Sequence, residues 1–255
     1  MQGKSFLTLA VLAAIAWFLY SLLNDGPKPL PQNGGGNFSR QDSGANFRSE
    51  RSNARSSAGN DETEPAGAQD FDFYVLSLSW SPSYCATEGS RDRQQCGSER
   101  PYAFIAHGLW PQHENGYPAD CPTGKSYVPR DLVSQMRDIM PSGGLMGHEW
   151  RKHGSCTGLS QADYFAAVRR AYEMVNIPVS FRNSAQSRAV DPMQVENAFI
   201  AANPRIPAGG IAVTCQDGYL EDVRICMTKD LKFRNCGEVD AKACRRRSVT
   251  MPPVE

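Results

Sequence analysis

Histidine spacing is the feature of this chain that bears most directly on chemistry. Histidine occurs at positions 107, 113, 148 and 153, and two of these residues enclose the segment H-E-W-R-K-H. A zinc-hydrolase helix needs two histidines four residues apart, so that both face one metal. His148 and His153 are five residues apart, which places them about 140° apart on a helix. This spacing argues against a shared metal. It puts Glu149 on one face with His153 and Lys152 on one face with His148, which suits proton transfer.

A second imidazole lies in the segment F-I-A-H-G-L-W-P, residues 104–111. The pattern predicts that His107 stands at the end of a strand, where Gly108 lets a ligand approach closely. Trp110 offers an indole on which a base could stack, and burial in the core is the alternative for this side chain. His113 has no comparable motif around it and is expected on the surface.

These two histidine segments closely resemble the active-site segments of the ribonuclease T2 family. The opening F-D-F-Y-V-L-S-L-S-W-S-P-S-Y-C looks like that family's first core strand, and the C-terminal part from V-T-C onward is similar to its closing sheet. The resemblance covers about residues 71–250. It implies an endoribonuclease with His153 as general base and His107 as general acid. It also implies that Lys152 stabilises the phosphorane, Glu149 orients and polarises the site, His148 contacts the phosphate, Trp110 stacks on a base and Tyr117 assists it.

The implied reaction is chemically reasonable because RNA carries a nucleophile beside every phosphodiester. A base removes the 2′-proton, the oxygen attacks phosphorus, and an acid protonates the leaving 5′-oxygen, which yields a 2′,3′-cyclic phosphate. Two imidazoles can supply both transfers without a metal, and each transfer is typically worth about 10²–10⁴-fold. A nearby cation stabilises the charge that the phosphorane gains. We therefore expect single-stranded RNA but not DNA as substrate, low base specificity, and no metal or cofactor.

Two positions depart from the family pattern. Several members carry an acidic residue two positions after the motif tryptophan, where it bonds a base. Gln112 stands there in this chain and offers both a donor and an acceptor, so we expect it to contact the base, with base preference left open. Ser155 replaces the commoner threonine, and little consequence is expected.

Two other classes of function stay open. The first is a binding module that holds RNA or another anionic polymer without cutting it, although the full proton-transfer set argues against this reading. The second is a zinc hydrolase, which the histidine spacing argues against.

Hydrophobic periodicity predicts the elements that must position these residues. Strands are expected at 71–80, 103–109, 211–215 and 222–227, and helices at 132–140, 147–153, 161–176 and 192–202. The elements do not alternate strictly as βαβ units, which favours an α+β fold. We expect a central antiparallel sheet, flanked by several helices and stapled by disulfides.

The eight cysteines all follow residue 70, and none forms a C-x-x-C pair. This usage is typical of a disulfide framework in an oxidising compartment. Sequence alone allows about a hundred pairings. The resemblance implies Cys85–Cys96, Cys121–Cys156, Cys215–Cys244 and Cys226–Cys236.

The N-terminal segments indicate how the protein reaches that compartment. The apolar run from Phe6 to Leu23 is just long enough, at about 18 residues, to span a bilayer. We favour an uncleaved signal-anchor over residues 1–24, with a cleaved signal peptide as the alternative. Residues 25–70 are rich in Gly, Ser, Asn and Pro and are expected to form a disordered linker. The catalytic domain then spans 71–255.

Location and partners follow from these segments. We expect an extracytoplasmic protein, periplasmic or secreted, that contacts a membrane only through its N-terminal segment and is a monomer. The chain has no net charge, so contact with RNA should be local rather than spread over a broad basic face.

Overall fold

The computed structural model describes residues 70–97, 100–118, 121–122 and 124–254. The expected signal-anchor at 1–24 and the linker at 25–70 lie outside the described residues, apart from Asp70. Among the residues that are described, no helix is both long and apolar enough to cross a membrane.

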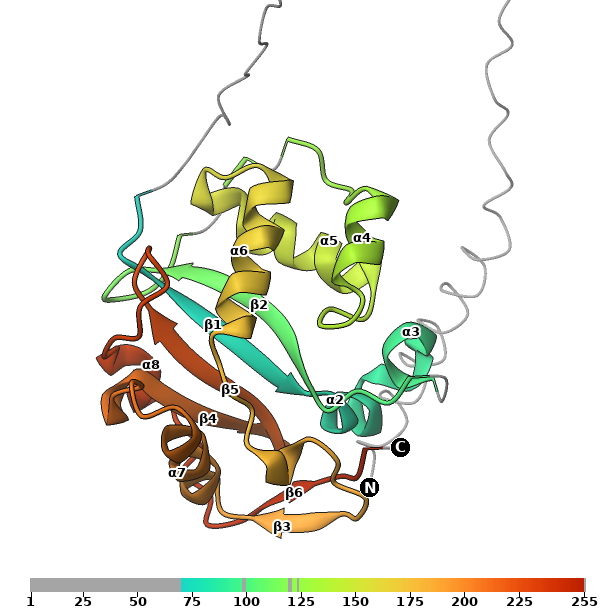
Figure 1. Cartoon of the computed structure of the whole chain (residues 1–255), viewed down its shortest axis with the longest axis vertical. Helices are drawn as coiled ribbons and strands as arrows, with labels where there is room; N and C mark the ends of the chain where they lie inside the picture. Colours follow the sequence, from blue (N-terminus) through green and yellow to red (C-terminus); the bar gives the residue numbers. More distant parts are fainter. Residues whose placement is uncertain (1–69, 98–99, 119–120, 123, 255) are drawn as a thin grey trace, which may run out of the picture. The chain divides into compact units, whose positions relative to one another are not determined.

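A mostly antiparallel sheet forms the centre of the described part of the chain (Figure 1). Its strands are β1 (Phe73–Trp80), β2 (Phe104–Gln112), β3 (Arg188–Val190), β4 (Ile211–Gln216), β5 (Tyr219–Met227) and β6 (Val249–Met251). They follow the order β2-β1-β5-β6-β3, and β4 also pairs with β5. Only the short β5–β6 contact is parallel among these pairs. The predicted α+β class with a disulfide-stapled sheet is confirmed.

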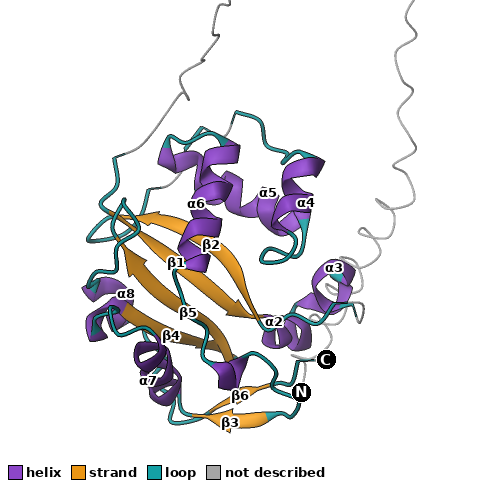
Figure 2. Ribbon diagram, viewed as in Figure 1, coloured by secondary structure: helices purple, strands orange, loops and turns teal. Residues whose placement is uncertain are grey.

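Helices cover the sheet as separate groups (Figure 2). They are α2 (Ser81–Thr87), α3 (Arg93–Cys96), α4 (Arg130–Met136), α5 (Gly143–Lys152), α6 (Gln161–Glu173), α7 (Pro192–Ala202) and α8 (Gly237–Ala241), with 3₁₀ turns at Gly89–Arg91, Gly154–Thr157, Val179–Phe181 and Ala208–Gly210. Figure 1 shows α4, α5 and α6 gathered beside β2, whereas α7 and α8 lie beside β4.

The sequence of β1 explains its central place in the fold. Its side chains are buried on both faces of the sheet. Leu76 and Leu78 join the main core with the helices, while Phe73 and Val75 join a second cluster with Cys226 of β5. A strand that is apolar on both faces must be covered on both faces. The strand ends at Trp80, and Pro82 lies in the first turn of α2, where its missing N–H is not needed.

Most predicted elements are present, with shifted ends. Helix 192–202 matches α7, and the predicted helix 147–153 begins earlier, at Gly143. Strand 103–109 continues through Pro111 to Gln112. It can do so because β2 is an edge strand, where a residue without an N–H is tolerated.

The eight cysteines form the four pairs that the resemblance implies, namely Cys85–Cys96, Cys121–Cys156, Cys215–Cys244 and Cys226–Cys236. The first joins α2 to α3. The second joins the segment after β2 to the turn that follows α5, and it therefore connects the two stretches of chain that carry the histidine motifs.

Candidate active site

His107 is placed by an irregularity in the pairing of β1 with β2. Ser77 pairs with Gly108, but Leu78 pairs with Ala106, so His107 is the extra residue of a β-bulge. Such bulges re-aim a side chain relative to the regular alternation of a strand. The prediction that His107 stands at a strand end is wrong, because β2 continues to Gln112 on the far side of the bulge.

Both ring nitrogens of His107 face oxygen atoms from other elements. Nε2 lies 3.5 Å from Oε1 of Glu149 on α5. Nδ1 lies 3.1 Å from the hydroxyl of Ser79 on β1 and 3.6 Å from Oδ1 of Asp222 on β5. The side chain keeps 33% of its surface exposed, so the imidazole is held by the protein and still reaches solvent.

Glu149 is the buried carboxylate at the centre of the site. Its side chain is only 1% exposed, and Oε2 accepts a hydrogen bond of 2.7 Å from the indole N–H of Trp110. The same oxygen fills the space above Gly108, where a Cβ atom would lie 2.0 Å from it. The room at Gly108 is therefore taken by the protein's own carboxylate, and the expectation that a ligand approaches closely there is wrong.

His153 follows the last residue of α5 rather than lying within the helix. Its backbone N–H still donates to the carbonyl of Glu149 at 2.9 Å. Its ring is buried and stacks on Trp110, with centroids 5.1 Å apart and planes at 27°. The ring of His107 contacts the same indole edge-on at 5.4 Å. Trp110 thus brings together two imidazoles that are far apart in the sequence.

The electrostatic surroundings shift the pKa values of the two imidazoles in opposite directions. Burial alone would lower the pKa of His107, but the Asp222 carboxylate and the charge of Glu149 raise it to about 8. Burial and the positive charges of Lys152 and His107 lower the pKa of His153 to about 3. Between these two values His107 carries a proton and His153 does not.

Two carboxylates beside His107 also differ from each other. Burial raises the pKa of Glu149 to about 7, although His107 and the Trp110 hydrogen bond act in the opposite direction. Burial would also raise the pKa of Asp222, but its interactions with His107, Arg224 and Ser79 hold that pKa well below the usual range. Asp222 therefore stays ionised where Glu149 can take up a proton.

His148 and Lys152 are exposed on α5 beside this centre. Burial and the charge of Lys152 lower the pKa of His148. The described part of the chain contains no group of three or more His, Cys, Asp or Glu residues placed to hold a metal ion.

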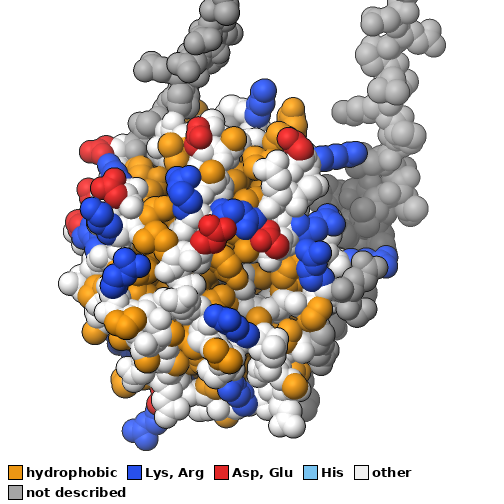
Figure 3. Space-filling view, in the orientation of Figure 1, with side chains coloured by type: hydrophobic (Ala, Val, Ile, Leu, Met, Phe, Trp, Pro, Cys, Tyr) orange, Lys and Arg blue, Asp and Glu red, His pale blue; other side chains and the backbone are white. Residues whose placement is uncertain are grey.

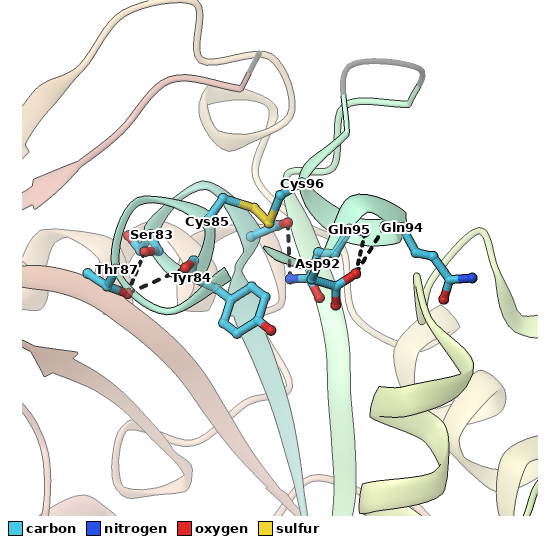
Figure 4. The surroundings of a disulfide bond; sticks show 9 residues. Ser83, Tyr84, Cys85, Thr87, Asp92, Gln94, Gln95 and Cys96 are labelled. Atoms are coloured by element: carbon cyan, nitrogen blue, oxygen red, sulfur yellow. Dashed lines mark hydrogen bonds between the residues drawn. A yellow bond between two sulfur atoms is a disulfide. The ribbon is translucent and has the colours of Figure 1, made fainter. Parts of the chain in front are cut away.

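A cavity of about 520 Å³ opens beside His107 and His148. Its other walls come from β1, β5, α2 and α3, including Tyr84, Asp92 and Gln95. Figure 4 shows that the Cys85–Cys96 disulfide holds α2 and α3 together at this wall, where Asp92 accepts hydrogen bonds from the backbone of Gln94 and Gln95. The disulfide thus fixes one side of the space next to His107.

The residues expected to bind a base lie along the end of β2 and the loop after it. Trp110 is half-buried, contacts both imidazoles, and has the Arg224 guanidinium 5.1 Å from its ring. Gln112 is the last residue of β2 and is half-buried, and Tyr117 is 55% exposed. His113, expected on the surface, is partly exposed and has Nδ1 3.9 Å from Asp72. Base contact by Trp110, Gln112 and Tyr117 stays a prediction.

Three residues of the site were not predicted from the sequence: Ser79, Asp222 and Arg224. Arg224 donates a hydrogen bond of 3.1 Å to Oδ2 of Asp222, and Ser79 donates to Oδ1. A buried strand that reads Glu-Asp-Val-Arg offers a hint, because charged residues rarely lie in such strands without a partner. The pairing of β5 with β1, which the sequence does not reveal, is what brings Asp222 opposite Ser79.

Comparison with known proteins agrees with this geometry. The model of the Ribonuclease T2 family matches residues 71–236. A ribonuclease of Aeromonas hydrophila is 34% identical over 167 residues, which is 64% of this chain and 74% of that protein. Ribonuclease DdI of Dictyostelium discoideum is 31% identical over 197 residues, 69% of this chain and 82% of that protein. The chain belongs to the ribonuclease T2 family, a family of RNA-cleaving enzymes.

Solved structures support the fold. An RNase-related protein from Calystegia sepium superposes with a TM-score of 0.59 at 22% identity, covering 73% of this chain and all (100%) of that one. RNase NT, solved in complex with 5′-AMP, gives a TM-score of 0.56 at 24% identity and covers 72% of this chain and 100% of its own.

Proposed function

We propose that this enzyme cleaves single-stranded RNA by transphosphorylation, in which the 2′-hydroxyl attacks the adjacent phosphorus and a 2′,3′-cyclic phosphate is the product. The observation that carries the proposal is that the imidazoles of His107 and His153 both pack against the indole of Trp110, in surroundings that shift their pKa values in opposite directions. His153, with a pKa of about 3, is neutral and can accept a proton. His107, with a pKa of about 8, is protonated and can donate one. This assigns the base and the acid as the family resemblance does.

In the proposed reaction, His153 takes the proton of the 2′-hydroxyl and His107 gives its Nε2 proton to the leaving 5′-oxygen. Lys152, which is exposed on α5 and whose charge acts on His153, stabilises the phosphorane. His148 contacts the phosphate from the rim of the cavity that it shares with His107. Glu149, which lies 3.5 Å from His107 Nε2, orients and polarises the acid.

Metal independence and low base specificity belong to the same proposal. The nucleophile comes from the substrate and both proton carriers are imidazoles, so no step requires a metal-bound water. Gln112 can donate or accept a hydrogen bond, which supports tolerance of several bases.

The proposed location is extracytoplasmic, periplasmic or secreted. Four disulfides support an oxidising compartment. On the face shown in Figure 3, acidic and basic side chains are interspersed, which supports short, local contact with RNA. A monomeric state is a further part of the proposal. Membrane contact through residues 1–24 is part of this proposal.

Product analysis on a defined RNA oligomer, with EDTA present, tests the mechanism. We expect cyclic phosphate ends, no cleavage of the matching DNA, and a fall in rate of at least about 10²-fold in His107→Ala. Equal cleavage of DNA would contradict attack by the 2′-hydroxyl. Loss of activity in EDTA that zinc restores would favour a metal hydrolase, and tight RNA binding without turnover would favour a binding module.

A further inference from the structure

Asp222 is the most firmly held ionised group near His107, and the mechanism above gives it no task. It lies on β5 directly opposite Ser79 of β1 in the strand register, and its side chain is 1% exposed. Oδ1 accepts from the Ser79 hydroxyl, and Oδ2 accepts from Arg224 at 3.1 Å. The Asp222 backbone N–H donates to the Thr214 hydroxyl at 3.2 Å. A buried carboxylate so fully bonded has a fixed position.

We propose that Asp222, acting through the hydroxyl of Ser79, is a positioning residue that keeps a proton on Nδ1 of His107 and so leaves Nε2 as the only atom that exchanges the catalytic proton. This inference rests on the proposed role of His107 as the acid. Ser79 shares the task, and neither residue touches the reacting atoms.

The number of protons available at Ser79 determines the direction of these hydrogen bonds. A serine hydroxyl has one proton to donate, and Ser79 donates it to Asp222. The contact of 3.1 Å between the Ser79 oxygen and His107 Nδ1 must then have Nδ1–H as its donor. Asp222 cannot reverse this direction, because its interactions keep it ionised and an ionised carboxylate has no proton to give.

The fixed Nδ1–H determines how the other ring nitrogen behaves. Which nitrogen of a histidine titrates is set by the hydrogen bond that the other one makes. With Nδ1–H held by Ser79, the neutral ring must have a bare Nε2, and protonation adds a hydrogen there. Nε2 is the nitrogen beside Glu149. The same atom therefore receives and delivers the proton in every turnover.

Other charged groups also face His107, and the test must separate them from Asp222. Glu149 approaches from α5 and Arg224 from β5, while the charge of His107 acts on His148 and His153. None of these contacts Nδ1. A measurement on that nitrogen thus reports on the Ser79–Asp222 pair.

Long-range ¹H–¹⁵N correlation spectra of the full chain, recorded above the His107 pKa of about 8, identify the tautomer directly. The His107 signals are assigned by their loss in His107→Gln. We expect the neutral ring to carry its proton on Nδ1 in the wild type. An Nε2–H tautomer there would overturn the proposal, whether or not the protein cleaves RNA. If the tautomer is Nδ1–H but RNA is not cut, the proposed function fails while the positioning stands.

Kinetics supply the second readout. Asp222→Asn should lower kcat by about 10–100-fold, the usual loss when the partner that orients a functional imidazole is removed, with KM changed less than about twofold. The alkaline limb of the pH–rate profile should move to lower pH. Ser79→Ala should lower kcat by about tenfold, and Ser79→Thr, which restores a hydroxyl, should recover most of it.

Ser77→Ala is the matched control. Ser77 lies on the same strand, is fully buried, and its hydroxyl has no partner among the described residues, so kcat should not change. If Asp222→Asn fails to fold because Arg224 loses its partner, Ser79→Ala and the wild-type spectrum still decide the outcome. If kcat and the pH–rate profile are unaltered in Ser79→Ala, Asp222 does not act on His107 through Ser79.

Discussion

The indole N–H of Trp110 donates a 2.7 Å hydrogen bond to Glu149, so the aromatic residue that contacts both imidazoles also secures the buried carboxylate beside His107. Trp110 was expected to serve the substrate, and its place in the structure gives it a second role within the protein. That role can be separated from base stacking by a substitution that keeps an aromatic ring and removes the N–H donor.

Trp110→Phe should destabilise the protein by about 1–3 kcal/mol, because Glu149 loses a hydrogen bond in a buried position. It should also raise the pKa of Glu149 further and so change the pH dependence of kcat. Urea denaturation and a pH–rate profile measure the two effects. Trp150→Phe is the matched control, since that indole bonds the Lys125 carbonyl at 2.9 Å: stability should fall similarly, with the pH dependence of kcat unaltered. Identical pH profiles in Trp110→Phe and the wild type would contradict the role given to this hydrogen bond.

The pH–rate profile of the wild type should have a broad plateau that lies mainly below pH 7. The base must be neutral, which holds above the His153 pKa of about 3, and the acid must be protonated, which holds below the His107 pKa of about 8. Measured kcat/KM on a short RNA should therefore fall on the alkaline side near that upper value. Full activity maintained well above pH 8 would mean that His107 is not the acid.

The free energy of unfolding should depend on His153 in the acidic pH range. A histidine with a lowered pKa in the folded state contributes stability above its unfolded value of about 6.5 and loses it as pH falls toward the folded value of about 3. His153→Gln should thus gain stability relative to the wild type as pH drops below about 6.5, at a slope of up to about 1.4 kcal/mol per pH unit. Free energies of unfolding at several pH values test this, and parallel curves for the two proteins would refute it.

Gly108→Ala should damage both stability and activity. The added Cβ would lie 2.0 Å from Glu149 Oε2 and 2.5 Å from Trp110 Nε1, and such overpacking typically costs about 1–3 kcal/mol. Gly143→Ala is the control: at the start of α5 its Cβ would lie 3.4 Å from a methyl group of Val133, away from the cavity beside His107, so this variant should keep its activity and its stability. Thermal melts and kcat measure the contrast, which would vanish if β2 could simply move away from α5.

Removal of the Cys121–Cys156 bridge by paired serine substitutions should lower stability by about 2–4 kcal/mol and also lower kcat in the folded protein. His153 lies three residues before Cys156, and the bridge anchors that turn. Paired serines at Cys215 and Cys244 are the control, because that bridge closes a similar loop, 29 residues against 35. They should cost comparable stability and leave kcat unaltered. Equal kcat losses in both variants would argue for a general effect of unfolding.

The sequence made much of this site predictable because its motifs are local. The segments around His107 and His153 identify the site residues directly, and the apolar stripe of α6 defines a helix without tertiary information. What could not be predicted depends on pairing between distant strands. Asp222 reaches His107 only because β5 lies beside β1, and His107 is aimed by a bulge that no local pattern marks. The short elements α3, β3 and β6 span only three or four residues each, too few for periodicity to show.

His107 and His153 lie on parts of the fold that differ in their free energy of local unfolding. Ser79 and Asp222, which hold His107, belong to β1 and β5 inside the sheet, and His107 belongs to the adjoining edge strand β2. His153 instead follows the end of α5, three residues before Cys156 of the Cys121–Cys156 bridge. Amides in a central strand exchange with solvent only in near-global unfolding, while helix ends fray at lower free energy. Mild heat or a thiol reductant should therefore displace His153 while β1 and β5 still hold His107. Catalysis should be lost before the sheet unfolds.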